Sequence, residues 1–547
     1  MTTDEAFAAP LTNRLDMGDG VLVVGGGTMG AGIAFVAAQA GYDVEVVEPQ
    51  AASRERGVAQ VQRDAQRAGD AAIEGRIRWI DAIPSSSSAM LAIEAVPERF
   101  ELKRDVFVAL ARTLEPSALL ATNTSSLAVA DLADVAPNPE RVLGLHFFNP
   151  PQRMQLIEVV GAPQTSDETI ERGFEIAVRL GKHPVFAADT PGFIVNRVAR
   201  PYYLQSLRAL ERGVASVEEL DAVARAAGFR MGPFELMDLI GLDVNLATTE
   251  SIYARTQERR LAPVELQRRM VAEGRLGRKT GAGFYAYRDG KHERFEPAAE
   301  PQRGDRDREE CVVVVGFGGL ADDLAGAIEQ RYERAARIEN DELLGDLEQG
   351  ATIVIDVGDG ASDRGDVIAR LDATLGPETV LFVDAYATDL EACARRLRHP
   401  ERLIGYGILG SWSGQSALEI VDSAASDDAL ELARELFASL GKAVILVEDA
   451  PGLFLGRTVG SIVNEAMVAV HDHVASPEDV DTALLLGANY PHGPIAWGRE
   501  IGGARLSRIL RRLAQAEGEA FAPHRSLWVL DVEPEPDAEP EPAEAGQ

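Results

Sequence analysis

Four polar side chains lie where predicted strands or helices end, and together they could perform acid–base chemistry on an alcohol. They are Ser125, His146, Glu158 and Asn196, in the segments TNTSSL, LHFFNP, LIEVV and TPGFIVNR. Histidine suits the removal of a hydroxyl proton because its unperturbed pKa, about 6.5, lies near neutral pH. A nearby glutamate would stabilise the protonated imidazole and fix its tautomer, as the acid does in a serine-protease triad. The serine and the asparagine could hydrogen-bond the reacting oxygen.

The histidine and the glutamate each have a purely structural interpretation when taken alone. A single histidine after a strand is more often a hydrogen-bonded structural residue, and Glu158 could face solvent from the strand LIEVV. The occurrence of all four residues in one pattern favours the functional interpretation.

A glycine-rich segment near the amino end predicts a dinucleotide site. Gly25, Gly27 and Gly30 form a GxGxxG motif between the β-branched run Val21–Val24 and the helical pattern AGIAFVAAQAG. The first glycine permits a tight turn, the second lets the backbone approach a pyrophosphate, and the third allows close helix–strand packing. The structural alternative is a glycine-rich turn in some other α/β protein, since the spacing alone is weak evidence.

The next predicted strand, Asp43–Val47, ends at Glu48. A carboxylate at this position can accept hydrogen bonds from an adenine-ribose hydroxyl and repels a 2′-phosphate. We therefore expect NAD rather than NADP as the cofactor.

These motifs resemble the 3-hydroxyacyl-CoA dehydrogenase family over about residues 20–287, and the spacings of 21, 12 and 50 residues among the four polar positions also fit. The resemblance implies NAD-dependent oxidation of an L-3-hydroxyacyl-CoA to a 3-oxoacyl-CoA, with His146 as general base paired with Glu158, and Ser125 and Asn196 completing the catalytic set. It also implies cofactor contacts at Gly25, Gly27, Thr28, Met29, Gly30, Glu48, Glu98, Lys103, Asn123, Ser125, Asn149 and Lys279.

Lysine is rare in this chain, which has only five among its 54 basic residues. Two of them, Lys103 and Lys279, fall where the resemblance implies cofactor contacts. A compact ammonium fits some positions that a guanidinium fork does not, although random survival is the alternative explanation. Because coenzyme A carries a 3′-phosphate, the arginines of the predicted second helix are candidates to bind it: Arg54, Arg56, Arg63 and Arg67.

Phrases repeat along the chain at an offset of 260 or 261 residues; for example, LGKHPVFAADTPGFIVNR recurs as LGKAVILVEDAPGLFLGR. We therefore predict an α/β Rossmann domain plus an all-α C-terminal domain, followed by a degenerate second copy of both. At the amino end the offset is 291, so the second copy has lost about 30 residues there. The predicted parts are an extension (1–19), the NAD-binding domain (20–188), a helical domain (189–290), a linker (291–310), a truncated Rossmann-like domain (311–449), a second helical domain (450–533) and a disordered acidic tail (534–547).

The second copy keeps only one of the four polar residues. Tyr386, Gly407 and Gly456 stand at the positions of the serine, histidine and asparagine, and Glu419 alone persists. We expect this copy to be catalytically inactive, so that substitution of Tyr386 or Gly456 leaves turnover nearly unchanged. Because the resemblance makes the helical domain a dimer surface, we expect the two helical domains to form an internal pseudo-dimer, with a homodimer of chains as a further option.

The tandem arrangement resembles the bacterial phenylacetate-pathway type of the family, which implies 3-hydroxyadipyl-CoA as substrate. Arg153, Arg197 or Arg200 could bind its distal carboxylate. The alternatives are 3-hydroxybutyryl-CoA, a hydroxy acid without coenzyme A, and a non-catalytic NAD-binding role.

Composition sets the remaining limits. The chain has 547 residues and a net charge of −33, which disfavours nucleic acid as a partner. It has no apolar run of about 20 residues, no secretory signal pattern and only two cysteines. We expect a cytoplasmic enzyme of small-molecule metabolism that has no metal ligands and acts away from membranes.

Overall fold

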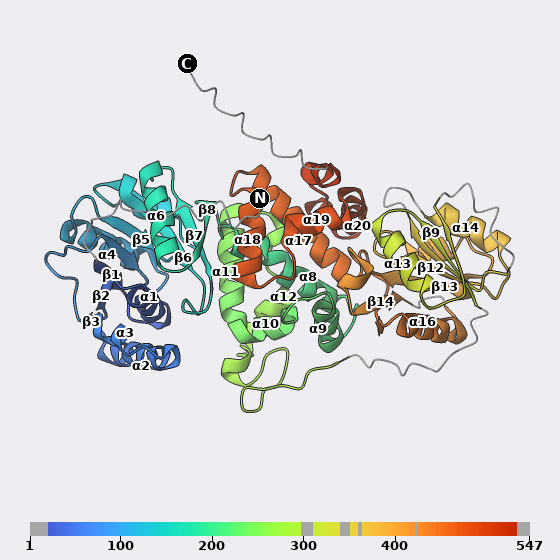
Figure 1. Cartoon of the computed structure of the whole chain (residues 1–547), viewed down its shortest axis with the longest axis horizontal. Coiled ribbons are helices and arrows are strands. Elements are labelled where there is room, and N and C mark those ends of the chain that lie inside the picture. The colour runs from blue at the N-terminus through green and yellow to red at the C-terminus, as the bar shows by residue number, and fades with distance from the viewer. Residues whose placement is uncertain (1–19, 297–309, 340–349, 359–363, 422–424, 533–547) are drawn as a thin grey trace, which may run out of the picture. The chain divides into compact units, whose positions relative to one another are not determined.

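The computed structural model describes residues 20–296, 310–339, 350–358, 364–421 and 425–532. The predicted amino-terminal extension, most of the linker and the predicted disordered tail lie outside these residues. The chain divides into two compact units, Met1–Ile194 and Val195–Gln547. Figure 1 colours the chain by residue number, from the blue first unit to the red end of the second.

The first unit contains an eight-stranded sheet in the order β3-β2-β1-β4-β5-β6-β7-β8, parallel except for the β6–β7 pair. Most of its strands are continuous apolar runs, as burial between two helical layers requires. The strand order reverses between β1 and β4, and in sheets of this kind ligands bind at the carboxyl ends of the strands on either side of such a reversal. The strands are β1 Gly20–Val24, β2 Asp43–Val47, β3 Ile77–Ile80, β4 Leu91–Glu94, β5 Leu119–Thr122, β6 Val142–Phe147, β7 Leu156–Gly161 and β8 His183–Ala188.

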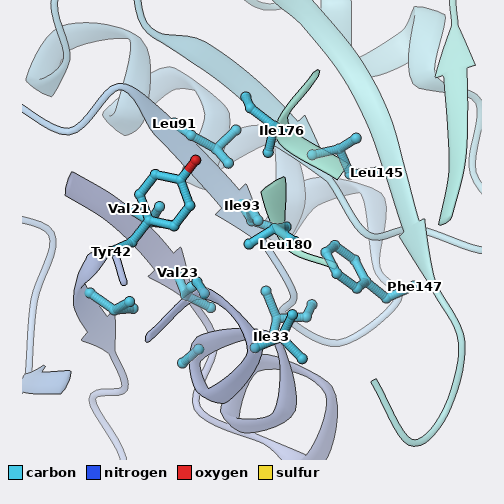
Figure 2. Packing of buried hydrophobic residues seen from close by; sticks show 14 of the residues in the cluster. Val21, Val23, Ile33, Tyr42, Leu91, Ile93, Leu145, Phe147, Ile176 and Leu180 are labelled. Carbon is cyan, nitrogen blue, oxygen red and sulfur yellow. The ribbon is translucent and has the colours of Figure 1, made fainter. Parts of the chain in front are cut away.

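The core of this unit joins the sheet to helices from both ends of the unit's sequence. Ile33 of α1 and Ile176 of α6 belong to one buried cluster with Val23 and Phe147 (Figure 2). Tyr42 lies in the same cluster, and its buried hydroxyl has no hydrogen-bond partner among the described residues. The helices are α1 Thr28–Gln39, α2 Ala51–Ala68, α3 Ala72–Gly75, α4 Phe100–Thr113, α5 Val129–Ala133 and α6 Asp167–Arg179, with a 3₁₀ turn η1 at Pro139–Arg141.

The second unit begins with a helical segment. Its second helix, α8, has Pro201 in its first turn, where a missing N–H does no harm, and α9 begins with a capping box of Ser216 and Glu219. The elements are α7 Val195–Val198, α8 Arg200–Glu211, α9 Val217–Ala226, α10 Pro233–Ile240, α11 Leu242–Thr256 and α12 Glu265–Ala272, with 3₁₀ turns η2 Arg259–Leu261 and η3 Arg278–Thr280.

A second sheet follows, in the order β10-β9-β11-β12-β13-β14-β15, again with one antiparallel pair, β13–β14. The order matches that of the first sheet with the outermost strand omitted, so the predicted second copy is confirmed. The offset between equivalent strand residues shows where the two copies differ in length. Val21 and Val312 are 291 residues apart, but their equivalent strand partners, Leu91 and Ile353, are only 262 residues apart. The chain therefore lost 29 residues between β10 and β11, a stretch that in the first copy holds α2, α3 and β3. The strands are β9 Cys311–Gly316, β10 Arg334–Ile338, β11 Ile353–Gly358, β12 Val380–Asp384, β13 Leu403–Gly407, β14 Ala417–Val421 and β15 Ala443–Leu446.

The last helices of the unit repeat the order of the first helical segment. The α17 helix is continuous where the first copy has α7 and α8, and Ser461 replaces Pro201 there. The helices of this copy are α13 Gly319–Glu329, α14 Gly365–Thr374, α15 Leu390–Ala394, α16 Asp427–Ser439, α17 Leu455–His471, α18 Pro477–Ala488, α19 Pro494–Ile501 and α20 Gly503–Glu517, with 3₁₀ turns η5 Pro400–Arg402, η6 Trp412–Gly414, η7 Glu519–Phe521 and η8 Arg525–Asp531.

The α7–α8 segment and α17 pack against each other inside the second unit (Figure 1). Two of their polar contacts are reciprocal. The Nε of Arg197 donates to Glu465 at 2.8 Å, and the Nε of Arg457 donates to Gln205 at 3.1 Å. Both partners of the first contact lie 260 residues from the corresponding residues of the second. Such an exchange is the pattern of a two-fold interface, in which one surface meets a copy of itself.

No helix in the described ranges is long and apolar enough to cross a membrane.

Candidate active site

The first unit brings His146 and Glu158 into direct contact. They lie opposite each other in the antiparallel pair β6–β7, which places their side chains on the same face of the sheet. The Nδ1 of His146 is 2.6 Å from an Oε of Glu158. The imidazole is 6% exposed and the glutamate 0%, so both groups are removed from bulk water. His146 and Glu158 are twelve residues apart in the sequence because a short connection joins the two adjacent strands that carry them.

The surroundings of this pair fix the orientation of the imidazole. The backbone N–H of Ile194 donates to the other Oε of Glu158 at 3.0 Å. The ring of Phe148 lies 4.7 Å from that of His146, and the ring of Phe193 lies 5.7 Å from it. In a neutral imidazole beside an ionised carboxylate, Nδ1 donates this hydrogen bond and Nε2 keeps its lone pair. The pair can therefore act as a base through Nε2.

A second carboxylate, Glu98, organises the loop that carries Ser125. It accepts hydrogen bonds from the backbone N–H groups of Ser125 and Ser126, at 3.1 and 3.0 Å, and from the hydroxyls of Thr124 and Ser126. Burial by itself would raise the pKa of the Glu98 carboxyl, but the Lys103 charge and these hydroxyls outweigh burial and lower that pKa to about 2. The group is thus an anion at neutral pH, and it holds the segment TNTSSL in one conformation.

Lys103 is buried beneath this loop, with an exposure of 1%. Its Nζ lies 2.8 and 3.0 Å from the two carboxylate oxygens of Glu94, 3.1 Å from Glu98 and 3.4 Å from the carbonyl of Val96. The role visible here is to position Glu98 from below. A direct contact between the ammonium and the cofactor, which the family resemblance implies, stays a prediction.

The glycine-rich loop fits a dinucleotide phosphate. A Cβ on Gly25, whose φ is +109°, would lie 2.5 Å from the carbonyl oxygen of Ala95, and a Cβ on Gly30 would lie 1.8 Å from that of Gly25. Nothing lies within 4 Å of the place where a Cβ on Gly27 would stand. The backbone at Gly27 and Thr28 is therefore open, at the point where α1 begins and its N–H groups face outward.

Glu48 supports the same loop from the end of β2. One carboxylate oxygen accepts the N–H of Gly26 at 3.0 Å, and the other accepts the N–H of Gln50 at 2.9 Å. The structure thus gives this residue a structural task in addition to the ribose contact predicted for it.

Two further predicted cofactor residues follow strands β5 and β6. The Oδ1 of Asn123 accepts the N–H of Phe147 at 2.8 Å, which ties the ends of these strands together. Asn149 is exposed and precedes Pro150 through a cis peptide bond. Of the other predicted positions, Thr28 is exposed and Met29 is partly exposed in the first turn of α1.

Asn196 and Lys279 belong to the second compact unit. Asn196 lies on α7, two residues after Ile194 in the chain, and Lys279 lies on η3 in an ion pair with Asp243. Their approach to the residues of the first unit stays a prediction.

The candidate arginines for the coenzyme A phosphate all lie on α2, as the sequence suggested. Arg54 donates to the carbonyl of Glu48, Arg56 to Ser53 and Arg67 to Asp64. Arg63 is exposed. Which of them meets a phosphate stays a prediction.

In the second copy, the ring of Tyr386 fills the space beside Gly407 and Gly456, the positions equivalent to His146 and Asn196. Gly407 pairs with Glu419 across β13–β14, as His146 pairs with Glu158 across β6–β7. The ring of Tyr386 would lie 2.5 Å from a Cβ on Gly407 and 2.8 Å from one on Gly456, and its hydroxyl donates to Glu419 at 2.7 Å. Burial raises the pKa of the Glu419 carboxyl to about 7, against hydrogen bonds from Phe454, Tyr386 and Leu455.

The expectation that turnover survives substitution of Tyr386 or Gly456 stays a prediction, whereas the packing bears on the stability of such variants. Tyr386 and Gly456 are not neutral remnants, because the tyrosine is fully buried and the glycine leaves room for its ring. Their substitution is expected to disturb the fold of the second copy, since a Cβ at Gly456 overlaps the ring.

Sequence reasoning missed several residues of the site. The hydroxyls of Thr124 and Ser126 were visible in TNTSSL, but nothing in the segment distinguished them from Ser125. The backbone N–H of Ile194 and the ring of Phe193 carry no sequence signal, because their roles depend on where the chain passes after β8.

Comparison with known proteins gives consistent matches along the chain. Residues 20–190 match the family model of the 3-hydroxyacyl-CoA dehydrogenase NAD-binding domain, and residues 192–287 and 452–535 match that of the C-terminal domain of the same enzymes. The chain is 36% identical over 514 residues to 3-hydroxyadipyl-CoA dehydrogenase of Escherichia coli, covering 91% of this chain and 94% of the relative. It is 39% identical to the mitochondrial hydroxyacyl-coenzyme A dehydrogenase of Sus scrofa, over 49% of this chain and 91% of the relative. Among solved structures, 3-hydroxybutyryl-CoA dehydrogenase of Escherichia coli is similar, with a TM-score of 0.74, 34% identity and coverage of 94% of this chain and 98% of that one.

Proposed function

The chain belongs to the 3-hydroxyacyl-CoA dehydrogenase family, and from this premise we propose that His146 and Glu158 carry its catalytic chemistry. The enzyme is an NAD-dependent dehydrogenase that oxidises 3-hydroxyacyl-CoA substrates. The observation that supports the proposal for the site is the buried contact of 2.6 Å between the histidine Nδ1 and the glutamate.

The protein's part in the reaction is to move one proton and to hold the oxygen that loses it. The Nε2 of His146 takes the hydroxyl proton, and the carboxylate of Glu158 stabilises the imidazolium that forms. Ser125 and Asn196 hydrogen-bond the oxygen as it becomes a carbonyl. When bound, NAD accepts the hydride from the carbon that carries this oxygen.

NAD fits the loop of the first unit. The open backbone at Gly27 and the first turn of α1 would hold the pyrophosphate, and Glu48 would accept a ribose hydroxyl. Glu98 would fix the loop next to Ser125.

Each chain then has one active site, and the second copy has a structural role. Its helical domain (450–533) forms an internal pseudo-dimer with the first (189–290), supported by the reciprocal contacts of the α7–α8 segment with α17. We propose the domain boundaries that the sequence predicts. We also propose that the enzyme acts in the cytoplasm.

The proposal extends to the acyl group of the substrate. The two Escherichia coli relatives are named for 3-hydroxyadipyl-CoA and 3-hydroxybutyryl-CoA. We propose the dicarboxylic substrate, with 3-hydroxybutyryl-CoA as the second candidate.

A rate assay with purified enzyme tests the function. With NAD and an L-3-hydroxyacyl-CoA, the absorbance of reduced nicotinamide is expected to rise, whereas the free hydroxy acids give little or no rate. If free hydroxy acids and their coenzyme A esters had equal kcat/KM, the result would favour a hydroxy-acid dehydrogenase that acts without coenzyme A. Binding of NAD without turnover of any substrate would favour a non-catalytic role.

Replacing Glu48 with alanine is expected to reduce the preference for NAD over NADP. The change removes the repulsion of a 2′-phosphate, and it also removes the acceptor of the Gly26 N–H, so the KM for NAD rises as well. The ratio of kcat/KM for the two cofactors measures the effect, which we expect to be about tenfold or more. An unchanged ratio would assign Glu48 to the support of the loop alone.

A further inference from the structure

A lysine holds the connection between the two strands that carry His146 and Glu158. Residues 148–155 form this β6–β7 connection. The Nζ of Lys182, which lies in the turn between α6 and β8, donates to the carbonyl oxygen of Pro151 at 2.6 Å and to that of Met154 at 2.8 Å. One ammonium thus ties the connection to a neighbouring turn of the first unit.

The second copy repeats this contact. The Nζ of Lys442 donates to the carbonyl oxygen of Trp412 at 2.6 Å and to that of Gln415, in the connection between β13 and β14. In each copy the two carbonyls are three residues apart, and Lys442 lies 260 residues after Lys182. Since the second copy has kept the contact without the histidine and asparagine, the contact serves the conformation of the connection itself.

Both positions carry a lysine although lysine supplies only five of the 54 basic residues. Burial lowers the pKa of Lys182 and of Lys442, and no carboxylate among the described residues opposes this effect. The charge is therefore held by carbonyl oxygens. A compact ammonium places three donors on one nitrogen, so it can bind two nearby carbonyls at once, whereas a guanidinium spreads its donors over a planar fork. Hydrogen bonds from a charged donor are also the stronger ones.

Two further contacts join the same connection to the helices next to the glycine-rich loop. The Nε2 of Gln152 donates to a carboxylate oxygen of Asp64 on α2 at 2.9 Å. Pro151 is buried against α1, where its Cδ would lie 2.9 Å from a Cβ on Gly32. Because α1 begins at the proposed pyrophosphate position, the anchored connection has a fixed place relative to the cofactor loop.

The β6–β7 connection also carries two residues that bear on the reaction. Its first residue is Phe148, whose ring lies 4.7 Å from that of His146. Its second residue is Asn149, which is exposed and is one of the predicted cofactor contacts. Only Pro150 separates Asn149 from the first carbonyl that Lys182 binds, so movement at the anchored carbonyls displaces both residues.

We propose that Lys182 is a positioning residue of the dehydrogenase. Its ammonium holds the β6–β7 connection so that Phe148 packs against the imidazole of His146 and Asn149 faces NAD. The proposal rests on the function proposed above and extends it to a residue that contacts neither substrate nor cofactor. Without the ammonium the connection samples other conformations, and the apparent affinity for NAD falls with the fraction of molecules that keep the competent one.

Replacing Lys182 with methionine tests the proposal, because methionine keeps an unbranched side chain and removes the ammonium. The KM for NAD is expected to rise about tenfold or more, as for the loss of a charged hydrogen bond. The kcat is expected to fall by a smaller factor, since the contact between His146 and Glu158 lies within the sheet. Initial rates at varied NAD measure both effects, and titration with NAD in the absence of substrate measures its dissociation constant.

Lys442→Met is the matched control, because it removes the equivalent contacts from the copy that has lost the histidine. Its thermal midpoint is expected to fall at least as far as that of Lys182→Met, since the ammonium of Lys442 also lies 4.8 Å from the centre of the Trp412 ring. Its KM for NAD and its kcat are expected to match those of the wild type. A Lys182 that only stabilises the fold would behave in the same way as Lys442.

Two further variants test whether the ammonium itself is required. Lys182→Arg keeps a charged donor, so it is expected to fold and to give a KM for NAD between those of the wild type and Lys182→Met. In Lys182→Cys, bromoethylamine restores an ammonium on a side chain of the same length, as the thiolate sulfur displaces bromide. Both native cysteines, Cys311 and Cys393, are buried, and wild-type protein treated alike is the control. The alkylated variant is expected to regain most of its affinity for NAD.

The outcomes separate this proposal from the function itself. If the KM and the dissociation constant for NAD are unchanged in both Lys182→Met and Lys182→Arg, or change equally in Lys442→Met, the positioning role is refuted and the dehydrogenase stands. If the wild type oxidises no 3-hydroxyacyl-CoA, the proposed function falls. The NAD dissociation constants of the same variants then still decide whether Lys182 places Asn149.

Discussion

Replacing His146 with alanine is expected to lower kcat by about 10²–10⁴-fold, the range that a positioned general base contributes. The imidazole is the group whose free nitrogen can take the hydroxyl proton, and Glu158 holds it from the other side at 2.6 Å. Binding of NAD is expected to persist, because the glycine-rich loop makes no contact that depends on His146. Initial rates with a 3-hydroxyacyl-CoA measure the first effect, and the NAD dissociation constant of the variant measures the second.

A matched control is available in the same sheet. His183 on β8 is an exposed histidine, so His183→Ala is expected to keep the wild-type rate. Glu158→Gln supplies the complementary test: it keeps the shape but removes the charge that stabilises the imidazolium, and kcat is expected to fall in that variant too. Wild-type turnover in His146→Ala would disprove the mechanism.

Replacing Glu465 with alanine is expected to destabilise the second unit by about 3 kcal/mol, near the lower end of the range for breaking a buried ion pair. Glu465 is 1% exposed and accepts from Arg197 at 2.8 Å and from Arg260 at 2.7 Å. Its removal leaves two guanidinium groups to their remaining partners, Asp472 and Glu258. The midpoint of thermal unfolding measures the loss.

Glu465→Gln is the informative comparison, because it gives this half of the interface the residue that the other half already has at Gln205. It retains an acceptor for Arg197, so its midpoint is expected to lie between those of the wild type and the alanine variant. Equal midpoints for all three proteins would show that the packing of α7 on α17 does not depend on this pair.

The contact between His146 and Glu158 could be predicted from the sequence because it depends on short-range spacing. His146 and Glu158 belong to adjacent strands, so a twelve-residue separation suffices to bring them together. The duplication was predictable for a similar reason: a constant offset survives in the sequence even where side chains have diverged.

Other parts of the site depend on packing that a linear pattern does not record. The burial of Lys103 between Glu94 and Glu98 follows from the way α4 covers β4, and the sequence showed only an unexpected lysine. Likewise the glycines at 407 and 456 appear in sequence as losses, whereas the ring of Tyr386 occupies the space that they leave. The three differences at Tyr386, Gly407 and Gly456 are thus coupled, because the tyrosine ring needs the space that both glycines leave.

The reciprocal contacts of the α7–α8 segment with α17 have a consequence for how the protein can change. In a dimer of identical chains, every substitution at a two-fold interface appears twice and must suit both sides. Here the two surfaces are encoded separately on one polypeptide, so equivalent positions can differ. Glu465 of one surface corresponds to Gln205 of the other. Likewise, the first copy has two helices, α7 and α8, where the second has the single helix α17. Because the halves are covalently joined, their pairing also does not weaken on dilution. The second copy could therefore lose its chemistry without depriving the first of a partner.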